Sequence, residues 1–263
     1  MNIVVCIKQV PDTTNVRIDP NTNTLIREGV ESVINPFDMY AIEEAVRTKE
    51  KTGGKVIVIS MGPPQVETAL REALSLGCDE AILLSDRAFA GSDTWATSYT
   101  LAMAIKKIKD FNVIFCGKQA SDGDTAQVGP GISAHLDIPQ VTYVKKIEKI
   151  DEKSAIVYRM TEEGYDVIET PLPVVLTVVK EINTPRIPSL KGKMTAKKAQ
   201  ILAWKAQDLN VNDKFIGLNG SPTQVVKIFT PSPRSGGEIF QGETDEVVVK
   251  LIDRIKDELK PKF

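Results

Sequence analysis

Short apolar runs rich in valine and isoleucine alternate with amphipathic stretches through the first half of the chain. Runs of this length and composition predict strands that are buried on both faces of a parallel sheet. The four predicted strands are residues 3–7, 55–60, 81–85 and 112–116.

Helix signals separate these strands. Asn35 and Pro36 fit the N-cap and the first turn of the first helix, which Gly53 ends. The other predicted helices are residues 64–77, a helix capped by Ser92 or Asp93, and residues 127–136. The alternation predicts an α/β fold with a doubly wound, mostly parallel sheet, and residues 16–26 predict an inserted hairpin.

The pattern changes after about residue 140. Four further strands joined by tight polar turns are expected to extend the sheet, partly in antiparallel pairing. They are residues 141–150, 155–160, 165–170 and 173–179. Residues 184–198 predict an exposed loop, residues 206–242 an irregular arm that wraps a partner, and residues 243–260 an amphipathic helix. We therefore divide the chain into an α/β domain (1–205) and a C-terminal arm with its helix (206–263).

Charge and hydropathy exclude several classes of function. The formal net charge is −2 and the pI is about 5.7, whereas binding to a nucleic-acid backbone needs a basic surface. No apolar stretch approaches the roughly 20 residues that cross a bilayer. The first residues predict a strand instead of a signal peptide. We expect a cytosolic protein with no membrane span and no nucleic-acid partner.

Catalytic and metal-binding side chains are scarce. The three cysteines form no close pair in the sequence, and His135 is the only histidine, so a zinc or iron–sulfur site and Ser-His-Asp chemistry are disfavoured. The adjacent Glu43 and Glu44 do not share a helix face and are expected to be solvated.

Four segments follow the predicted strands or begin the helices, at the edge where open α/β sheets bind ligands. The richest is residues 117–130, in which Gly123 and Gly129 permit close approach of a ligand and the next helix directs free N–H groups toward an anion. Thr125 and Gln127 offer hydrogen bonds, whereas Asp122 and Asp124 suit a helix cap or ribose hydroxyls better than a phosphate. Neither the Walker pattern nor the G-x-G-x-x-G fingerprint is present.

The same segments carry a resemblance to a known family. Val5-Cys6-Ile7-Lys8, Asn35-Pro36-Phe37, Met61-Gly62-Pro63, Gly117-Lys118-Gln119-Ala120 and Pro185-Arg186 ahead of Ala196-Lys197-Lys198 together resemble the beta subunit of electron-transferring flavoproteins. The similarity runs through nearly the whole chain. It implies an adenine-nucleotide-binding α/β fold and a heterodimer with an FAD-carrying alpha subunit.

The family has two branches, and both stay open. The run from Asp122 to Val128, with Gly123 where the housekeeping branch has an acidic residue, and the run Gly220–Val225 resemble the bifurcating branch of anaerobic metabolism. Its beta subunit binds FAD that NADH reduces, then sends one electron to ferredoxin or flavodoxin and the other to the alpha FAD, which serves a flavin-dependent dehydrogenase of acyl-CoA type. The housekeeping alternative binds only structural AMP. A further alternative is a stand-alone ATP-binding module of the universal-stress type.

The residues expected to bind the cofactor combine the strand ends, the helix starts and the resemblance. They are Cys6, Lys8, Asn35, Pro36, Phe37, Asp38, Met61, Gly62, Thr94, Thr97, Gly117, Lys118, Gln119, Ala120, Ser121, Asp122, Gly123, Asp124, Thr125, Ala126, Gln127, Val128, Thr223 and Gln224. Leu190 matches the leucine that the family inserts into a dehydrogenase pocket. No catalytic side chain is expected, because the flavin carries the redox chemistry.

Overall fold

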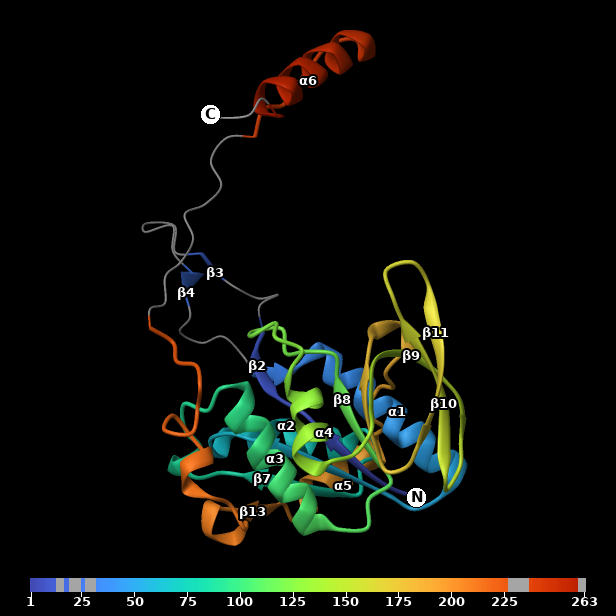
Figure 1. Ribbon diagram of the computed structural model, residues 1–263, viewed down its shortest axis with the longest axis vertical. Helices are drawn as coiled ribbons and strands as arrows, with labels where there is room; N and C mark the ends of the chain where they lie inside the picture. Colours follow the sequence, from blue (N-terminus) through green and yellow to red (C-terminus); the bar gives the residue numbers. More distant parts are fainter. Residues whose placement is uncertain (13–16, 19–24, 27–31, 227–236, 260–263) are drawn as a thin grey trace. The chain divides into compact units, whose positions relative to one another are not determined.

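A computed structural model describes residues 1–12, 17–18, 25–26, 32–226 and 237–259 of the chain (Figure 1). The chain forms two compact units, Met1–Val225 and Val226–Phe263. The described helices are α1 (Pro36–Thr52), α2 (Glu67–Ser75), α3 (Thr94–Ile108), α4 (Val128–Leu136), α5 (Leu190–Lys198) and α6 (Thr244–Leu259). No described helix has the length and hydropathy needed to cross a membrane.

A large, mostly parallel sheet organises the first unit and confirms the predicted fold class. Its strand order is β11-β10-β9-β12-β8-β1-β6-β7-β13. In chain order these strands are β1 (Asn2–Cys6), β6 (Lys55–Met61), β7 (Glu80–Leu84), β8 (Val113–Gly117), β9 (Gln140–Ile150), β10 (Ser154–Met160), β11 (Tyr165–Pro171), β12 (Val174–Val178) and β13 (Leu202–Trp204).

The strands predicted after residue 140 do extend the sheet, at one side of it (Figure 1). β12 pairs in parallel with β8 and β9, whereas β10 runs antiparallel to both β9 and β11. The mixed pairing confirms the predicted partly antiparallel extension. β13 on the opposite edge was not predicted, because a three-residue strand gives too short a period-2 pattern to recognise.

Two short ribbons accompany the main sheet. β3 (Arg17–Ile18) pairs with β4 (Leu25–Ile26) in antiparallel register, which confirms the inserted hairpin, although its predicted turn lies outside the described residues. β2 (Gln9–Pro11) pairs with β5 (Ser32–Ile34) and brings the chain back to the start of α1. The β2–β5 ribbon was not predicted.

Successive residues of the central strands face two separate hydrophobic cores, as alternation along a strand requires. Ile3 and Val5 of β1 pack in the core that α1 and α2 cover, whereas Val4 packs in the core that α3 and α4 cover. Both faces of the sheet are thus buried, and this explains why the parallel strands are continuous apolar runs.

Residues 184–198 are not simply a loop, because their second half forms helix α5. The Ser189 hydroxyl accepts a hydrogen bond from the Gly192 N–H (3.0 Å) and caps the helix start. The Arg71 guanidinium of α2 donates to the carbonyls of Ala196 (2.8 Å) and Ala199 (3.2 Å) at the helix end. The helix was missed because its stability comes from packing on α2 and not from its own sequence pattern.

Glu43 and Glu44 are buried, which corrects the expectation that they are solvated. The Asn183 side-chain amide donates to Glu44 (3.0 Å), and the Arg186 guanidinium Nε donates to Glu43 (2.8 Å). The adjacent carboxylates on α1 are covered because the chain beyond β12 returns over this helix, a long-range contact that the local pattern does not contain.

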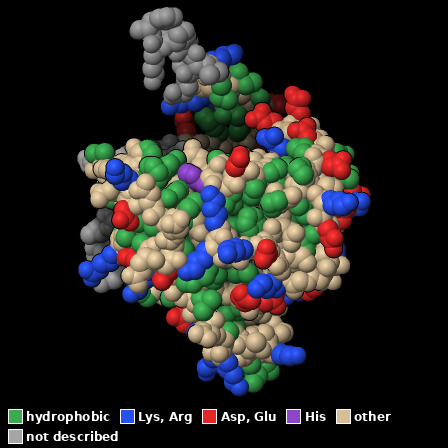
Figure 2. All heavy atoms as spheres, turned by 60° about the horizontal axis from the view of Figure 1, so that its bottom comes forward, with side chains coloured by type: hydrophobic (Ala, Val, Ile, Leu, Met, Phe, Trp, Pro, Cys, Tyr) green, Lys and Arg blue, Asp and Glu red, His purple; other side chains and the backbone are tan. Residues whose placement is uncertain are grey.

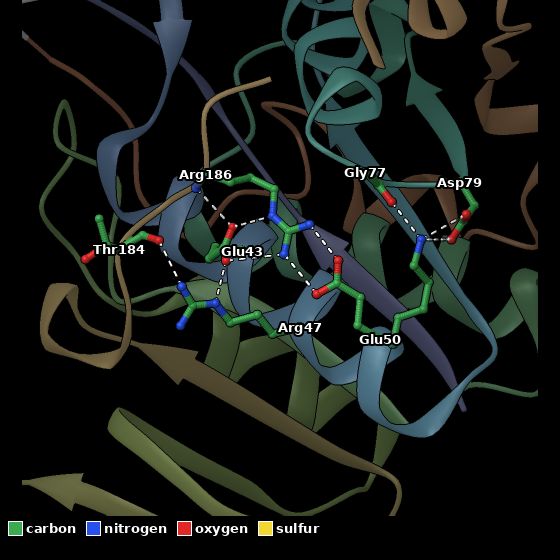
Figure 3. A network of polar contacts seen from close by, with 8 residues as sticks. Glu43, Arg47, Glu50, Gly77, Asp79, Thr184 and Arg186 are labelled. Atoms are coloured by element: carbon green, nitrogen blue, oxygen red, sulfur yellow. Dashed lines mark hydrogen bonds and ion pairs between the residues drawn. The ribbon is translucent and has the colours of Figure 1, made fainter. Parts of the chain in front are cut away.

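Figure 3 shows the clamp that the carboxylates of α1 form on the returning chain. Arg186 also binds Glu50 (Nη1 to Oε1, 2.7 Å), and Arg47 donates both to Glu43 and to the Thr184 carbonyl (3.1 Å). Burial acts to raise the pKa of Glu43, but its hydrogen bonds from Arg186 and Arg47 outweigh burial and lower the pKa below its ordinary value. Glu43 is therefore held as a carboxylate.

Figure 2 shows one face of the molecule, on which positive, negative and hydrophobic side chains are interspersed. This face carries no broad area of positive charge.

We predict that Arg186→Met lowers the free energy of unfolding by about 3 kcal/mol, because it leaves a buried carboxylate short of its main partner. The matched control is Lys55→Met, which removes the cation of an exposed ion pair with Glu80 and should cost less than about 1 kcal/mol. Urea unfolding of both variants measures the difference. Equal losses would contradict a buried, interdependent clamp.

Candidate functional site

The strand order of this sheet reverses between β1 and β8, which are neighbours, and we use the word crevice for the region beyond the carboxyl ends of these two strands. β1 leads into α1 on one face of the sheet, whereas the chain reaches β8 through α3 on the other face. In open α/β sheets ligands bind at such a reversal of strand order. Residues 7–8 and 117–118 lie at this point.

The Asp38 carboxylate joins both strand ends to the first turn of α1. One oxygen accepts from the Lys8 N–H (2.7 Å) and the other accepts from the Gly117 N–H (3.2 Å). Burial raises the pKa of Asp38 to about 7, against the opposing effect of these hydrogen bonds. The contacts of Asp38 are thus with the backbone that builds the crevice.

Asn35 occupies the predicted N-cap position of α1, but its side chain does not cap the helix. Its amide nitrogen donates to the Gln119 carbonyl (2.8 Å), and its amide oxygen accepts from the Ser121 N–H (3.0 Å). The Asn35 side chain therefore holds the loop that follows β8, and it does not cap α1.

The loop at residues 117–127 folds back as a tight turn. Asp124 N–H donates to the Ala120 carbonyl (2.9 Å), and the Asp122 carboxylate pairs with the Lys8 ammonium (2.8 Å). Gln119 donates to the Asp124 carboxylate. Asp124 (φ 53°) and Ala126 (φ 55°) adopt left-handed backbone conformations. Such conformations cost of order 1 kcal/mol for residues other than glycine and gather at functional sites.

Several N–H groups of this loop lack an acceptor in the described part of the chain, and Gly123 has open space beside it. For the backbone N–H groups of residues 125–129, no acceptor is found among the residues that the structure describes. A side-chain carbon placed on Gly123 would meet nothing within 4 Å. The loop and the first turn of α4 therefore offer unpaired N–H groups in the arrangement that anions bind.

The first turn of α3 borders the same loop. The Thr94 hydroxyl donates to the Gln127 side-chain oxygen (3.1 Å). Asp93 caps the helix by accepting from the Ala96 N–H (3.0 Å), and it also accepts from the N–H (2.9 Å) and hydroxyl (2.8 Å) of Thr223. Burial acts to raise the pKa of Asp93, but these hydrogen bonds lower it overall.

Other predicted residues lie at the same edge of the sheet. Cys6 and Cys116 are buried register partners at the ends of β1 and β8. A hydrogen bond between them and burial raise the pKa of Cys6, which keeps it a thiol. Met61 ends β6 and Gly62 follows it, with the Gly62 N–H donating to the Leu84 carbonyl (3.0 Å).

The remaining predicted residues differ in their surroundings. Pro36 and Phe37 belong to the first turn of α1, and Thr97 lies one turn into α3. Gln224 is exposed beside Thr223. Leu190 does not join this site, since it begins α5, where its side chain is 77% exposed.

Two residues of the site region were missed by the sequence analysis. The Ser221 hydroxyl accepts from the Asp93 N–H (2.8 Å) and so attaches the chain ahead of Thr223 to the start of α3. Tyr143 lies in β9, yet its ring contacts the Lys118 ammonium. Ser221 lies in the run Gly220–Val225 that carries the resemblance, but the run does not indicate its contact with Asp93. No local signal distinguishes Tyr143, and long-range folding creates both contacts. In the described part of the chain, no group of three or more His, Cys, Asp or Glu side chains could hold a metal ion.

Comparison with known proteins identifies similar chains. The Electron transfer flavoprotein domain family matches residues 22–209. The chain is 57% identical to the electron transfer flavoprotein subunit beta of Thermoanaerobacterium thermosaccharolyticum, with 97% of this chain and 98% of the relative covered. It is 52% identical to the caffeyl-CoA reductase-Etf complex subunit CarD of Acetobacterium woodii, covering 98% of each. It is 48% identical to protein FixA of Azotobacter vinelandii, covering 89% and 86%.

We predict that Gly117→Ala and Gly123→Ala differ sharply in stability. A methyl group on Gly117 would lie 2.3 Å from an Asp38 oxygen and 2.7 Å from the Phe37 carbonyl carbon, whereas on Gly123 it would meet open space. Gly117→Ala should cost about 2–3 kcal/mol in urea unfolding and Gly123→Ala under about 0.5 kcal/mol. Comparable losses would show that the turn of α1 does not press on Gly117 in this way.

A second prediction concerns the pH dependence that Asp38 creates. Its pKa rises from 3.8 in the unfolded chain to about 7 in the folded one, so its neutral form stabilises the fold in full below the lower value. This contribution disappears as the pH rises through about 7. Compared with Asp38→Asn, which cannot titrate, the wild type should lose up to about 1.4 kcal/mol per pH unit across this interval.

Urea unfolding of both proteins at several pH values measures this difference. The amide cannot satisfy both backbone donors, so the variant should be less stable than the wild type at low pH, and the difference should shrink as the pH rises. A difference that stays constant from pH ~4 to pH ~8 would mean that the Asp38 pKa does not change on folding.

Proposed function

Because this chain belongs to the electron transfer flavoprotein family and is a beta subunit, we propose that it holds FAD at the crevice between β1 and β8. In this proposal NADH delivers hydride to the flavin. The electrons are then divided between ferredoxin or flavodoxin and the FAD of an alpha subunit that serves a dehydrogenase. The observation that carries the proposal is the loop at residues 117–127, which Asn35 and Asp38 hold at the ends of these strands and whose N–H groups at residues 125–127 have no acceptor in the described part of the chain.

The residues present fit a dinucleotide diphosphate. The N–H groups of residues 125–129 have no acceptor among the described residues, and the helix dipole of α4 favours negative charge at the same place. Both acidic side chains of the loop are already engaged, Asp122 by Lys8 and Asp124 by Gln119. The Lys8 ammonium compensates the charge of Asp122, whereas the Gln119 amide is neutral and orients the Asp124 carboxylate without removing its charge.

The bound flavin would supply the hydride and single-electron chemistry, and the chain would supply position and electrostatics. Backbone donors of the loop would hold the diphosphate. The buried side chains of Cys6 and Cys116 lie at the ends of β1 and β8, and the raised pKa of Cys6 keeps it a neutral thiol. Thr94 and Gln127, which hydrogen-bond each other, and Thr223 on Asp93 border the loop on the α3 side. The proposal needs no catalytic side chain.

The partners proposed for this chain use surfaces outside the crevice. Leu190, Ile187 and Met194 are exposed hydrophobic side chains on or beside α5. This is the position at which the family inserts a leucine into a dehydrogenase, and similarity to a subunit of a caffeyl-CoA reductase complex supports a partner of acyl-CoA type. In the second unit, α6 exposes several apolar residues, including Val248, Leu251 and Ile255, and we propose that the arm and this helix pack on the alpha subunit.

Cofactor counting on the purified alpha–beta pair tests the proposal. Two FAD molecules per pair, with NADH bleaching of the flavin absorbance, are expected. One FAD with one AMP would replace the proposal by the housekeeping alternative. A stable homodimer that retains ATP without an alpha partner would replace it by the stand-alone nucleotide-binding module.

A substitution at Gly123 tests whether the FAD counted in the beta subunit binds at this loop. Gly123→Asp restores an acidic side chain beside the proposed phosphate site and should weaken FAD binding to the beta subunit at least about tenfold, equivalent to 1.4 kcal/mol. Gly164→Asp is the matched control, because a side-chain carbon on Gly164 would also meet nothing within 4 Å and this glycine lies in the turn between β10 and β11. Equal FAD content in both variants would argue against diphosphate binding at this loop.

A further inference from the structure

Lys118 occupies an unusual position at the end of β8. Its backbone N–H donates to the Val178 carbonyl (2.9 Å), while its ammonium lies over two aromatic rings, 5.2 Å from the centre of Phe37 and 5.3 Å from that of Tyr143. The side chain is half-buried, and it forms no ion pair with any carboxylate in the described part of the chain. By contrast Lys8, at the end of the adjacent strand, is paired with Asp122.

Tyr143 reaches Lys118 only through an unfavourable backbone conformation. Its φ is 57°, in the left-handed region that bulky residues rarely adopt inside a strand. The pairing of β9 with β12 shifts register between Leu176 and Val178, and the Tyr143 N–H donates to the Thr177 hydroxyl (3.1 Å) instead of a ladder carbonyl. Irregularities of this kind redirect a side chain and are retained where the redirected side chain has a role.

Two aromatic faces orient an ammonium group, but they do not neutralise its full charge. Asp122 is paired with Lys8, and neither Asp122 nor Asp124 forms an ion pair with Lys118 in the described part of the chain. A half-buried ammonium group that has no ion-pair partner within the chain favours the binding of an anion from outside the chain.

We propose that Phe37 and Tyr143 are positioning residues that present Lys118 to a negative charge of the bound dinucleotide. The charge is carried either by the diphosphate or by the flavin ring in its reduced, anionic form. This inference rests on the proposed function, and it adds Tyr143, which neither the sequence pattern nor the family motifs indicate. It also accounts for the register shift of β9, which accompanies the contact of the Tyr143 ring with Lys118.

Three variants of the full chain, purified with its alpha subunit, test the inference. Lys118→Gln removes the charge, and Tyr143→Gly removes the ring while relieving the left-handed backbone, so it should unfold no more readily than the wild type. Tyr143→Phe keeps the ring and is the control. Calorimetric titration with AMP, ADP and FAD, and the reduction potential of the bound flavin, are the measurements.

The two sources of negative charge give different results. If Lys118 meets the diphosphate, Lys118→Gln and Tyr143→Gly should bind ADP and FAD about tenfold more weakly, while Tyr143→Phe stays within about twofold of the wild type. If it meets the reduced ring, ADP and oxidised FAD should bind normally. The reduced flavin should then bind about tenfold more weakly, which lowers the two-electron potential by about 30 mV.

Two results for Lys118→Gln and Tyr143→Gly would together overturn the inference. Both variants would bind each nucleotide within about twofold of the wild-type affinity, and both would keep the flavin potential within about 10 mV of the wild type. A fall in Tyr143→Phe as large as in Tyr143→Gly would also overturn it, because the aromatic face would then not be the cause. A wild-type pair that binds none of the three nucleotides would instead overturn the proposed function, and the inference with it.

Discussion

The buried carboxylate of Asp38 is the contact on which the crevice depends. It accepts hydrogen bonds from the N–H groups of Lys8 and Gly117, at the ends of two strands that are adjacent in the sheet but far apart in the sequence. The close approach of α1 that this requires leaves no room for a side chain on Gly117. One acidic side chain thereby sets where the loop after β8 begins and which way it runs.

Helix α1 connects this crevice to the surface proposed for docking. Its first turn holds the loop through Asn35, and two turns later Glu43 holds Arg186 at the base of α5. Buried ion pairs are favourable when each partner is fully hydrogen-bonded, and Glu43 receives bonds from two guanidinium groups. Helix α1 therefore holds both the loop after β8 and residues 183–186, the segment ahead of α5.

The residues around the crevice fall into three groups: buried cysteines, acidic side chains with hydrogen-bond partners, and donors without acceptors. Cys6 and Cys116 are buried at the strand ends, and Lys8 and Gln119 bind the acidic loop residues. Among the described residues, the backbone N–H groups of residues 125–129 have no acceptor and the Lys118 ammonium has no ion-pair partner. A site whose backbone N–H groups lack acceptors in the described part of the chain favours an anionic ligand. This arrangement suits a protein that positions a cofactor and leaves the reaction to it.

The sequence alone determined the α/β class, the parallel strands, the hairpin, the glycine-rich loop and the family, because each depends on local periodicity or on motifs contiguous in the chain. It did not reveal α5, the burial of Glu43 and Glu44, or the contact of Tyr143 with Lys118. Each of these is created when segments distant in sequence meet: α5 on α2, residues 183–186 on α1, and β9 beside β12. Local patterns indicate which side chains could be buried or charged. Only the tertiary structure decides which distant residues contact them. It therefore also decides whether a carboxylate such as Glu43 is solvated or is buried in hydrogen bonds.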